Sequence, residues 1–117
     1  MLRSEFELEL RPGPQAPGTA RAAITRQLDD QLTAQQLFDL RVIVSTLVSN
    51  SVRNGSGPIE IHLMTGEDGV RGEVADQGKG AASLRGLADS ERRPGLSVLD
   101  AVATDWGVSS KRVWFVV

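Results

Sequence analysis

Val-Ala-Asp-Gln-Gly-Lys-Gly, residues 74–80, is the stretch of sequence on which the predicted architecture depends. A run of alternating apolar residues ends at Asp76, and two glycines spaced by one residue, Gly78 and Gly80, follow directly. Glycine permits positive φ and lets the backbone approach a ligand closely, because it has no Cβ. The pattern predicts a strand that carries a carboxylate to its end and then turns to form the floor of a ligand site. An ordinary Asp-containing turn is the alternative interpretation.

The sequence before this stretch predicts one strand and two helices. Residues 2–10 alternate between apolar and charged side chains, as a half-buried strand does. A helical spacing of apolar residues then runs from Pro17 or Thr19 to about Leu32. Thr33 and Gln36 have the spacing of a capping box, which predicts that the longest helix covers residues 34–53. Asn54 and Gly55 follow that helix and suit a left-handed C-cap.

The sequence after the second helix predicts a hairpin, a loop, a helix and a second hairpin. The predicted strands and helix are, in order, residues 59–65, 70–75, 95–105, 106–109 and 112–117, with the loop at 81–94. This order predicts an α/β fold of a single domain, residues 1–117. Its architecture is a two-layer sandwich, a mostly antiparallel mixed sheet with helices packed on one face.

Composition excludes several classes of function. The chain has no cysteine and one histidine, His62, which excludes disulfides, thiolate metal sites and multi-histidine metal centres. A net charge of −2 without a long basic run argues against a nucleic-acid surface. No apolar run has membrane-spanning length and no signal peptide is recognisable. We therefore expect a cytoplasmic protein that binds neither nucleic acid nor membrane.

A polar stripe runs along the second helix beside its apolar face. Thr46, Asn50 and Asn54 are spaced by four residues, so they share one side of the helix. Asn50 has two interpretations: a helix that frays toward Gly55, or an amide oxygen that points into a pocket and coordinates a hard cation such as Mg²⁺.

Three segments in this order resemble the histidine kinase-like (gyrase, chaperone and histidine kinase) ATPase superfamily, and within it the anti-sigma factor serine kinases and their relatives. The segments are residues 47–53, 74–80 and 95–108, and the closing Val-Trp-Phe of residues 113–115 matches as well. The resemblance covers nearly the whole chain and implies the Bergerat fold, which binds ATP.

The resemblance also implies roles for individual residues. Asn50 matches the asparagine that binds Mg²⁺, and Asp76 matches the aspartate that accepts a hydrogen bond from the adenine amino group. Gly78 and Gly80 match glycines that flank the nucleotide. Gly95 and Leu96 match the turn at the phosphate end, where N–H groups of a helix N-terminus favour an anion. Residues 81–94 would cover the phosphates, with Arg92 and Arg93 either as phosphate contacts or as a solvated pair.

The sequence departs from this family at four positions. Thr46 stands where the active kinases have the glutamate that serves as general base, and threonine does not accept a proton at neutral pH. Asn54 stands where family members often have histidine. In the turn before the last helix Arg93 replaces a glycine, and Pro94 has no N–H to donate. Arg112 stands near the place of a threonine that lies close to the adenine.

These observations lead to one main hypothesis and two alternatives. We expect an ATP-binding regulatory domain of the anti-sigma factor kinase-like class, with weak or absent kinase activity and ATP and Mg²⁺ as ligands. Its partner would be a bacterial sigma factor or an anti-sigma-antagonist protein. The alternatives are a working serine/threonine kinase that acts on the antagonist, and a protein-binding module that has lost ATP. The strand at residues 2–10 is expected at a sheet edge, where it could mediate a homodimer.

Overall fold

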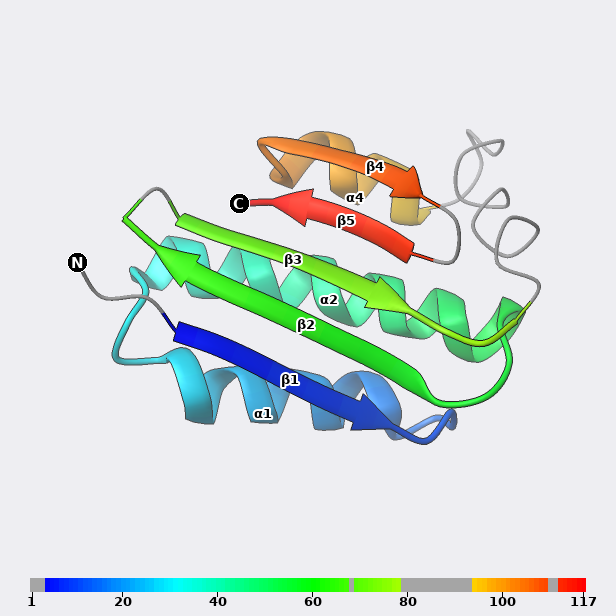
Figure 1. The fold of residues 1–117 in the computed structure, drawn as a ribbon. Helices are drawn as coiled ribbons and strands as arrows, with labels where there is room; N and C mark the ends of the chain where they lie inside the picture. Colours follow the sequence, from blue (N-terminus) through cyan, green and yellow to red (C-terminus); the bar gives the residue numbers. More distant parts are fainter. Residues whose placement is uncertain (1–3, 68, 79–93, 110–111) are drawn as a thin grey trace.

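A computed structural model describes residues 4–67, 69–78, 94–109 and 112–117 of the chain (Figure 1). Five strands form one sheet in the order β1-β2-β3-β5-β4, and all four strand pairs are antiparallel. The helices lie together on one face of this sheet (Figure 1). The elements are β1 (Ser4–Leu10), α1 (Ala16–Leu28), α2 (Ala34–Asn54), β2 (Ile59–Gly66), β3 (Gly69–Ala75), α4 (Pro94–Val102), β4 (Asp105–Ser109) and β5 (Arg112–Val116). The predicted two-layer α/β sandwich is confirmed, although the described strands include no parallel pair.

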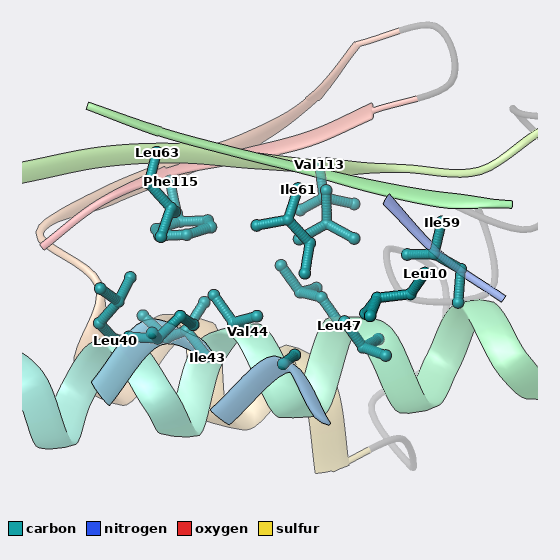
Figure 2. Close-up of a cluster of buried hydrophobic side chains, with 14 of the residues drawn as sticks. Leu10, Leu40, Ile43, Val44, Leu47, Ile59, Ile61, Leu63, Val113 and Phe115 are labelled. Atoms are coloured by element: carbon teal, nitrogen blue, oxygen red, sulfur yellow. The ribbon is translucent and has the colours of Figure 1, made fainter. Parts of the chain in front are cut away.

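The core lies between α2 and the inner face of the sheet (Figure 2). Apolar residues of α2 recur with the helical period and those of the strands with a period of two, so each element buries one side. Burial of one large apolar side chain contributes about 1.5–3 kcal/mol, and this contact fixes the rotation of α2 about its axis. The fully buried residues that face each other are Leu40, Ile43, Val44 and Leu47 of α2 and Ile59, Ile61, Leu63, Val113 and Phe115 of the strands.

The two ends of α2 are built differently. At its start, Thr33 and Gln36 form the predicted capping box, in which each side chain bonds to the backbone of the other residue. At its end, Gly55 has φ −96° and ψ −165°, an extended conformation. The predicted left-handed cap at Gly55 is therefore wrong. The positive φ falls two residues later, at Gly57, where φ is +71°.

Two other helices end earlier than the apolar pattern predicts. Helix α1 ends at Leu28, its last buried residue, whereas the pattern continues to Leu32. Helix α4 ends at Val102 because Asp105, at the predicted helix end, pairs with Val116 in the sheet. The indole Nε1 of Trp106 donates a hydrogen bond to Asp100 of α4 at 2.9 Å, which ties α4 to β4.

The outer face of the sheet carries charged side chains, and none of the described helices covers it (Figure 1). Strand β1 is an edge strand, as predicted, and its outward residues are exposed glutamates, Glu5, Glu7 and Glu9. On the same face, the guanidinium of Arg71 in the central strand β3 lies over the ring of Trp114 in β5, 5.5 Å from its centroid. None of the helices in the described part of the chain combines the length and the apolar character needed to span a membrane.

Candidate functional site

The ends of α2 and β3 meet at one end of the sheet (Figure 1). The N–H of Gln77, just after β3, donates to the carbonyl of Ser56, just after α2, at 2.9 Å. This bond joins two loops that are separated by some twenty residues in the sequence. It brings the predicted site residues Asp76 and Gly78 to the end of the helix that carries Asn50.

Asp76 is a buried carboxylate, only 6% exposed. Its Oδ1 accepts the N–H of Gly78 at 2.7 Å, and this is its one hydrogen bond with the described residues. Among those residues no Lys, Arg or His forms an ion pair with it. Burial of a carboxylate without a full set of partners costs free energy, because water no longer satisfies its lone pairs. The side chain therefore has acceptor capacity available for the donor of a ligand.

Asn50 is also buried, at 3% exposure, and lies within the regular part of α2. Because the helix continues through Asn54, fraying does not explain an asparagine at this position. The Nδ2 of Asn54, one turn later, donates to the Oδ1 of Asn50 at 2.9 Å. This bond orients the amide oxygen that the resemblance assigns to Mg²⁺.

The described residues contain no group of three or more His, Cys, Asp or Glu side chains placed to hold a metal ion. A cation next to Asn50 would therefore take few ligands from the described part of the chain. Mg²⁺ accepts this arrangement, because it keeps several waters and is commonly bound by one or two protein ligands together with substrate phosphates. The donor set thus fits Mg²⁺ that arrives with a nucleotide.

Thr46 lies one turn before Asn50 on the same side of α2 and offers no base. Its hydroxyl donates to the carbonyl of Val42, in its own helix, at 2.8 Å. Asp39 is eleven residues before Asn50, about 16 Å along the helix axis, and accepts from Gln35 at 2.8 Å. Neither Thr46 nor Asp39 is placed to take a proton beside Asn50.

Two other carboxylates, Glu73 and Asp89, do not supply a base beside Asn50 among the described residues. Glu73 lies on the outer face of the sheet, where it pairs with Arg112 and lies 3.9 Å from the Nδ1 of His62. Asp89 lies outside the described residues. Among the described residues, the side chain one turn before Asn50 is that of Thr46 and not a carboxylate.

Gly95 and Leu96 lie in the first turn of α4. Helix α4 packs against α2 and begins toward the same end of the sheet as Asp76 (Figure 1). A helix N-terminus presents N–H groups to an anion, although Pro94, the first residue of the helix, contributes none. The predicted site residue Gly80, the arginines at 92 and 93, and all of the covering segment before Pro94 lie outside the described residues.

Arg112, which stands near the place of the family's threonine, lies on the outer face of the sheet. Its guanidinium is paired with Glu73, on the side of the sheet opposite α2. The neighbouring inward residue of β5 is the buried Val113. The guanidinium of Arg112 therefore points away from α2 and from the candidate site.

The outer face contains a hollow of about 400 Å³ that is a poor nucleotide site. Four glutamates line it, with His62 and Arg112 as the other charged or titratable residues. A triphosphate would be repelled by this negative charge. The glutamates are Glu7, Glu9, Glu60 and Glu73.

Comparison with known proteins supports the fold. No model of a protein family matches the sequence, and no curated protein sequence matches it either. Among solved structures, the chain is similar to the crystal structure of the RsbU and RsbW domains of Rv1364c from Mycobacterium tuberculosis, with a TM-score of 0.69 and 19% sequence identity. The match covers 96% of this chain and 31% of that one. This similarity confirms the predicted fold.

Proposed function

We propose that this chain is an ATP-binding regulatory domain of the anti-sigma factor kinase-like class, with weak or absent kinase activity. The observation that carries the proposal is the buried carboxylate of Asp76, which accepts one hydrogen bond from the described residues and lies at the end of the helix that carries the buried amide of Asn50. Two further findings support it: the three sequence segments that resemble this class, and a fold shared with a structure that contains an RsbW domain.

In this proposal each end of the nucleotide meets a different element. Asp76, at the end of β3, accepts a hydrogen bond from the adenine amino group, and Gly78 flanks the nucleotide. Asn50 offers its amide oxygen to Mg²⁺, which neutralises phosphate charge when bound. The first turn of α4, with Gly95 and Leu96, directs backbone N–H groups toward the phosphates.

The biological role would be to bind a sigma factor or an anti-sigma-antagonist protein in the bacterial cytoplasm. Nucleotide would act as a structural or switching ligand for that interaction. The chain spans less than a third of the length of the matched chain. The partner proposed here is therefore a proposal for this domain and not for the whole of that larger protein.

Calorimetric titration with ATP, with and without Mg²⁺, tests the proposal. We expect saturable binding that is tighter when Mg²⁺ is present and that is not reproduced by GTP. A chain that is folded by its melting transition but binds no ATP under either condition would instead support the alternative of a protein-binding module that has lost ATP.

Asn50→Ala is expected to lower the affinity for Mg·ATP by about tenfold, or ~1.4 kcal/mol, and to leave metal-free ATP binding unchanged. The loss is limited because a water can replace one ligand of Mg²⁺. The hydrogen bond with Asn54 is also lost, which costs about 0.5–1.5 kcal/mol of folding stability. Titrations in Mg²⁺ and in chelator measure the difference.

Asn54→Ala is the matched control for this substitution, because it removes the same hydrogen bond and keeps the amide oxygen of Asn50. We expect this variant to retain Mg²⁺-dependent binding. Equal losses in both variants, with and without metal, would show that Asn50 acts through the structure of the helix and not through the cation.

The chain is further expected to form a homodimer through the free edge of β1. An edge strand presents unpaired backbone N–H and C=O groups that can pair with a second strand. Glu5, Glu7 and Glu9 of two copies would repel each other, so salt should strengthen the association by screening. Light scattering at several protein and salt concentrations measures the mass, and a monomeric mass throughout would contradict the dimer.

A further inference from the structure

Gly55, the first residue after α2, is packed directly against the carboxylate of Asp76. A Cβ placed on Gly55 would lie 2.3 Å from Oδ2, 2.5 Å from Cγ and 2.7 Å from Oδ1 of that side chain. Carbon atoms do not approach other heavy atoms this closely without a displacement. No side chain therefore fits at position 55 while the carboxylate of Asp76 keeps its position.

The backbone does not explain why this residue is glycine. Its φ of −96° and ψ of −165° are values that any residue can adopt. Gly57 is different, since its φ of +71° belongs to the left-handed region that favours glycine. At position 55 the requirement comes from the neighbouring carboxylate and not from the chain conformation.

The carboxylate is enclosed from a second side by Gly78. The N–H of Gly78 donates to Oδ1 at 2.7 Å, and a Cβ on Gly78 would lie 2.9 Å from that oxygen and 3.1 Å from the Cα of Gly55. The bond from Gln77 to Ser56 holds the two loops together at this point. Asp76 thus occupies a slot whose two walls are glycine backbone.

We propose that Gly55 is a positioning residue that sets the place of the Asp76 carboxylate and, through it, the preference for adenine. This inference rests on the proposed function. A side chain at position 55 would push the carboxylate out of its slot, so the directed hydrogen bond to an adenine amino group would be lost. Guanine carries a carbonyl oxygen at the same ring position, which cannot donate to Asp76, so its binding would be affected less.

Gly55→Ala tests the proposal, with Gly66→Ala as the matched control. A Cβ at Gly66, at the far end of β2 and β3, has no neighbour within 4 Å. We expect Gly55→Ala to weaken ATP binding roughly tenfold to a hundredfold, the effect of losing a hydrogen bond to a charged acceptor, and to reduce the preference for ATP over GTP. Gly66→Ala should bind like the wild type.

A double-mutant cycle with Asp76→Ala separates the positioning role from a general structural one. Removal of the carboxylate makes room for a Cβ, so Gly55→Ala should have no further effect on ATP affinity in the Asp76→Ala background. The melting temperatures of the same four proteins provide a second measurement. Gly55→Ala should lower the melting temperature when Asp76 is present, and should lower it clearly less in the Asp76→Ala background. If Gly55→Ala alone fails to fold, recovery of folding in the double variant supports the clash.

The outcomes are distinct. Wild-type affinity in Gly55→Ala, additive losses in the double variant, or a double variant that also fails to fold would each overturn the role of Gly55. A wild-type chain without ATP affinity would overturn the proposed function, and the adenine role of Gly55 with it. The melting cycle would then still measure the contact between Gly55 and Asp76.

Discussion

Thr46→Glu is expected to raise phosphate transfer by about a hundredfold to ten-thousandfold, the usual contribution of a general base. Position 46 lies one turn before Asn50 on the same side of α2, where the resembling kinases carry their glutamate. In the native chain the Thr46 hydroxyl donates to the carbonyl of Val42 and cannot accept a proton. Transfer of label from γ-labelled ATP to water or to an antagonist-type protein measures the gain.

Thr46→Gln is the control for size, because glutamine fills the same volume as glutamate without a basic group. We expect negligible transfer by the native chain and by this control. A native chain that already transfers phosphate at a rate normal for such kinases would contradict the prediction, and Asp89 would then be the first carboxylate to replace. The gain also requires that the turn at Pro94 admits the γ-phosphate.

Asp76→Ala is expected to weaken ATP binding by about tenfold to a hundredfold, since a hydrogen bond to a charged acceptor is worth roughly 1.5–3 kcal/mol. The melting temperature of this variant should not fall. The bond from Gly78 is lost, but so is the cost of burying a carboxylate that has few partners among the described residues. Calorimetry and thermal unfolding measure the two quantities.

Asp105→Ala is the matched control for this substitution. Asp105 also accepts a backbone N–H, that of Trp106, but it is exposed and lies at the opposite end of the sheet. We expect its ATP affinity to equal that of the wild type. An unchanged dissociation constant in Asp76→Ala would refute the adenine assignment, and a large drop in its melting temperature would favour the ordinary turn as the reason for this aspartate.

The parts of the fold that could be predicted are those whose signals are local. The alternation of apolar and charged residues predicted β1, and the spacing of Thr33 and Gln36 predicted the start of α2. The glycines at the end of β2 and the start of β3, Gly66 and Gly69, are typical of a hairpin, and the two strands pair as one. Each signal depends on residues a few positions apart, so the rest of the chain does not alter it. The helix ends were less well predicted because tertiary pairing decides them, as at Asp105, which joins the sheet.

The residues of the candidate site came from the resemblance, whereas their contacts with one another required the structure. The resemblance named Asn50 and Asp76, and both side chains are buried in the structure. It did not show that Gly55 borders the carboxylate, because that contact joins residues 21 positions apart and the local pattern indicated a helix cap. The face of the sheet on which Arg112 lies was not predicted, because a shift of one residue along a strand reverses the direction of a side chain.

The bond between Trp106 and α4 gives the molecule an intrinsic optical probe. The chain has two tryptophans and no tyrosine, so its near-ultraviolet emission comes almost entirely from Trp106 and Trp114. Trp114 lies on the outer face under Arg71, whereas the indole N–H of Trp106 bonds to Asp100 of the helix whose first turn is proposed to meet the phosphates. Replacement of Trp114 by phenylalanine would leave a single fluorophore, bonded to α4, and its spectrum would follow the movement of that helix without an attached label.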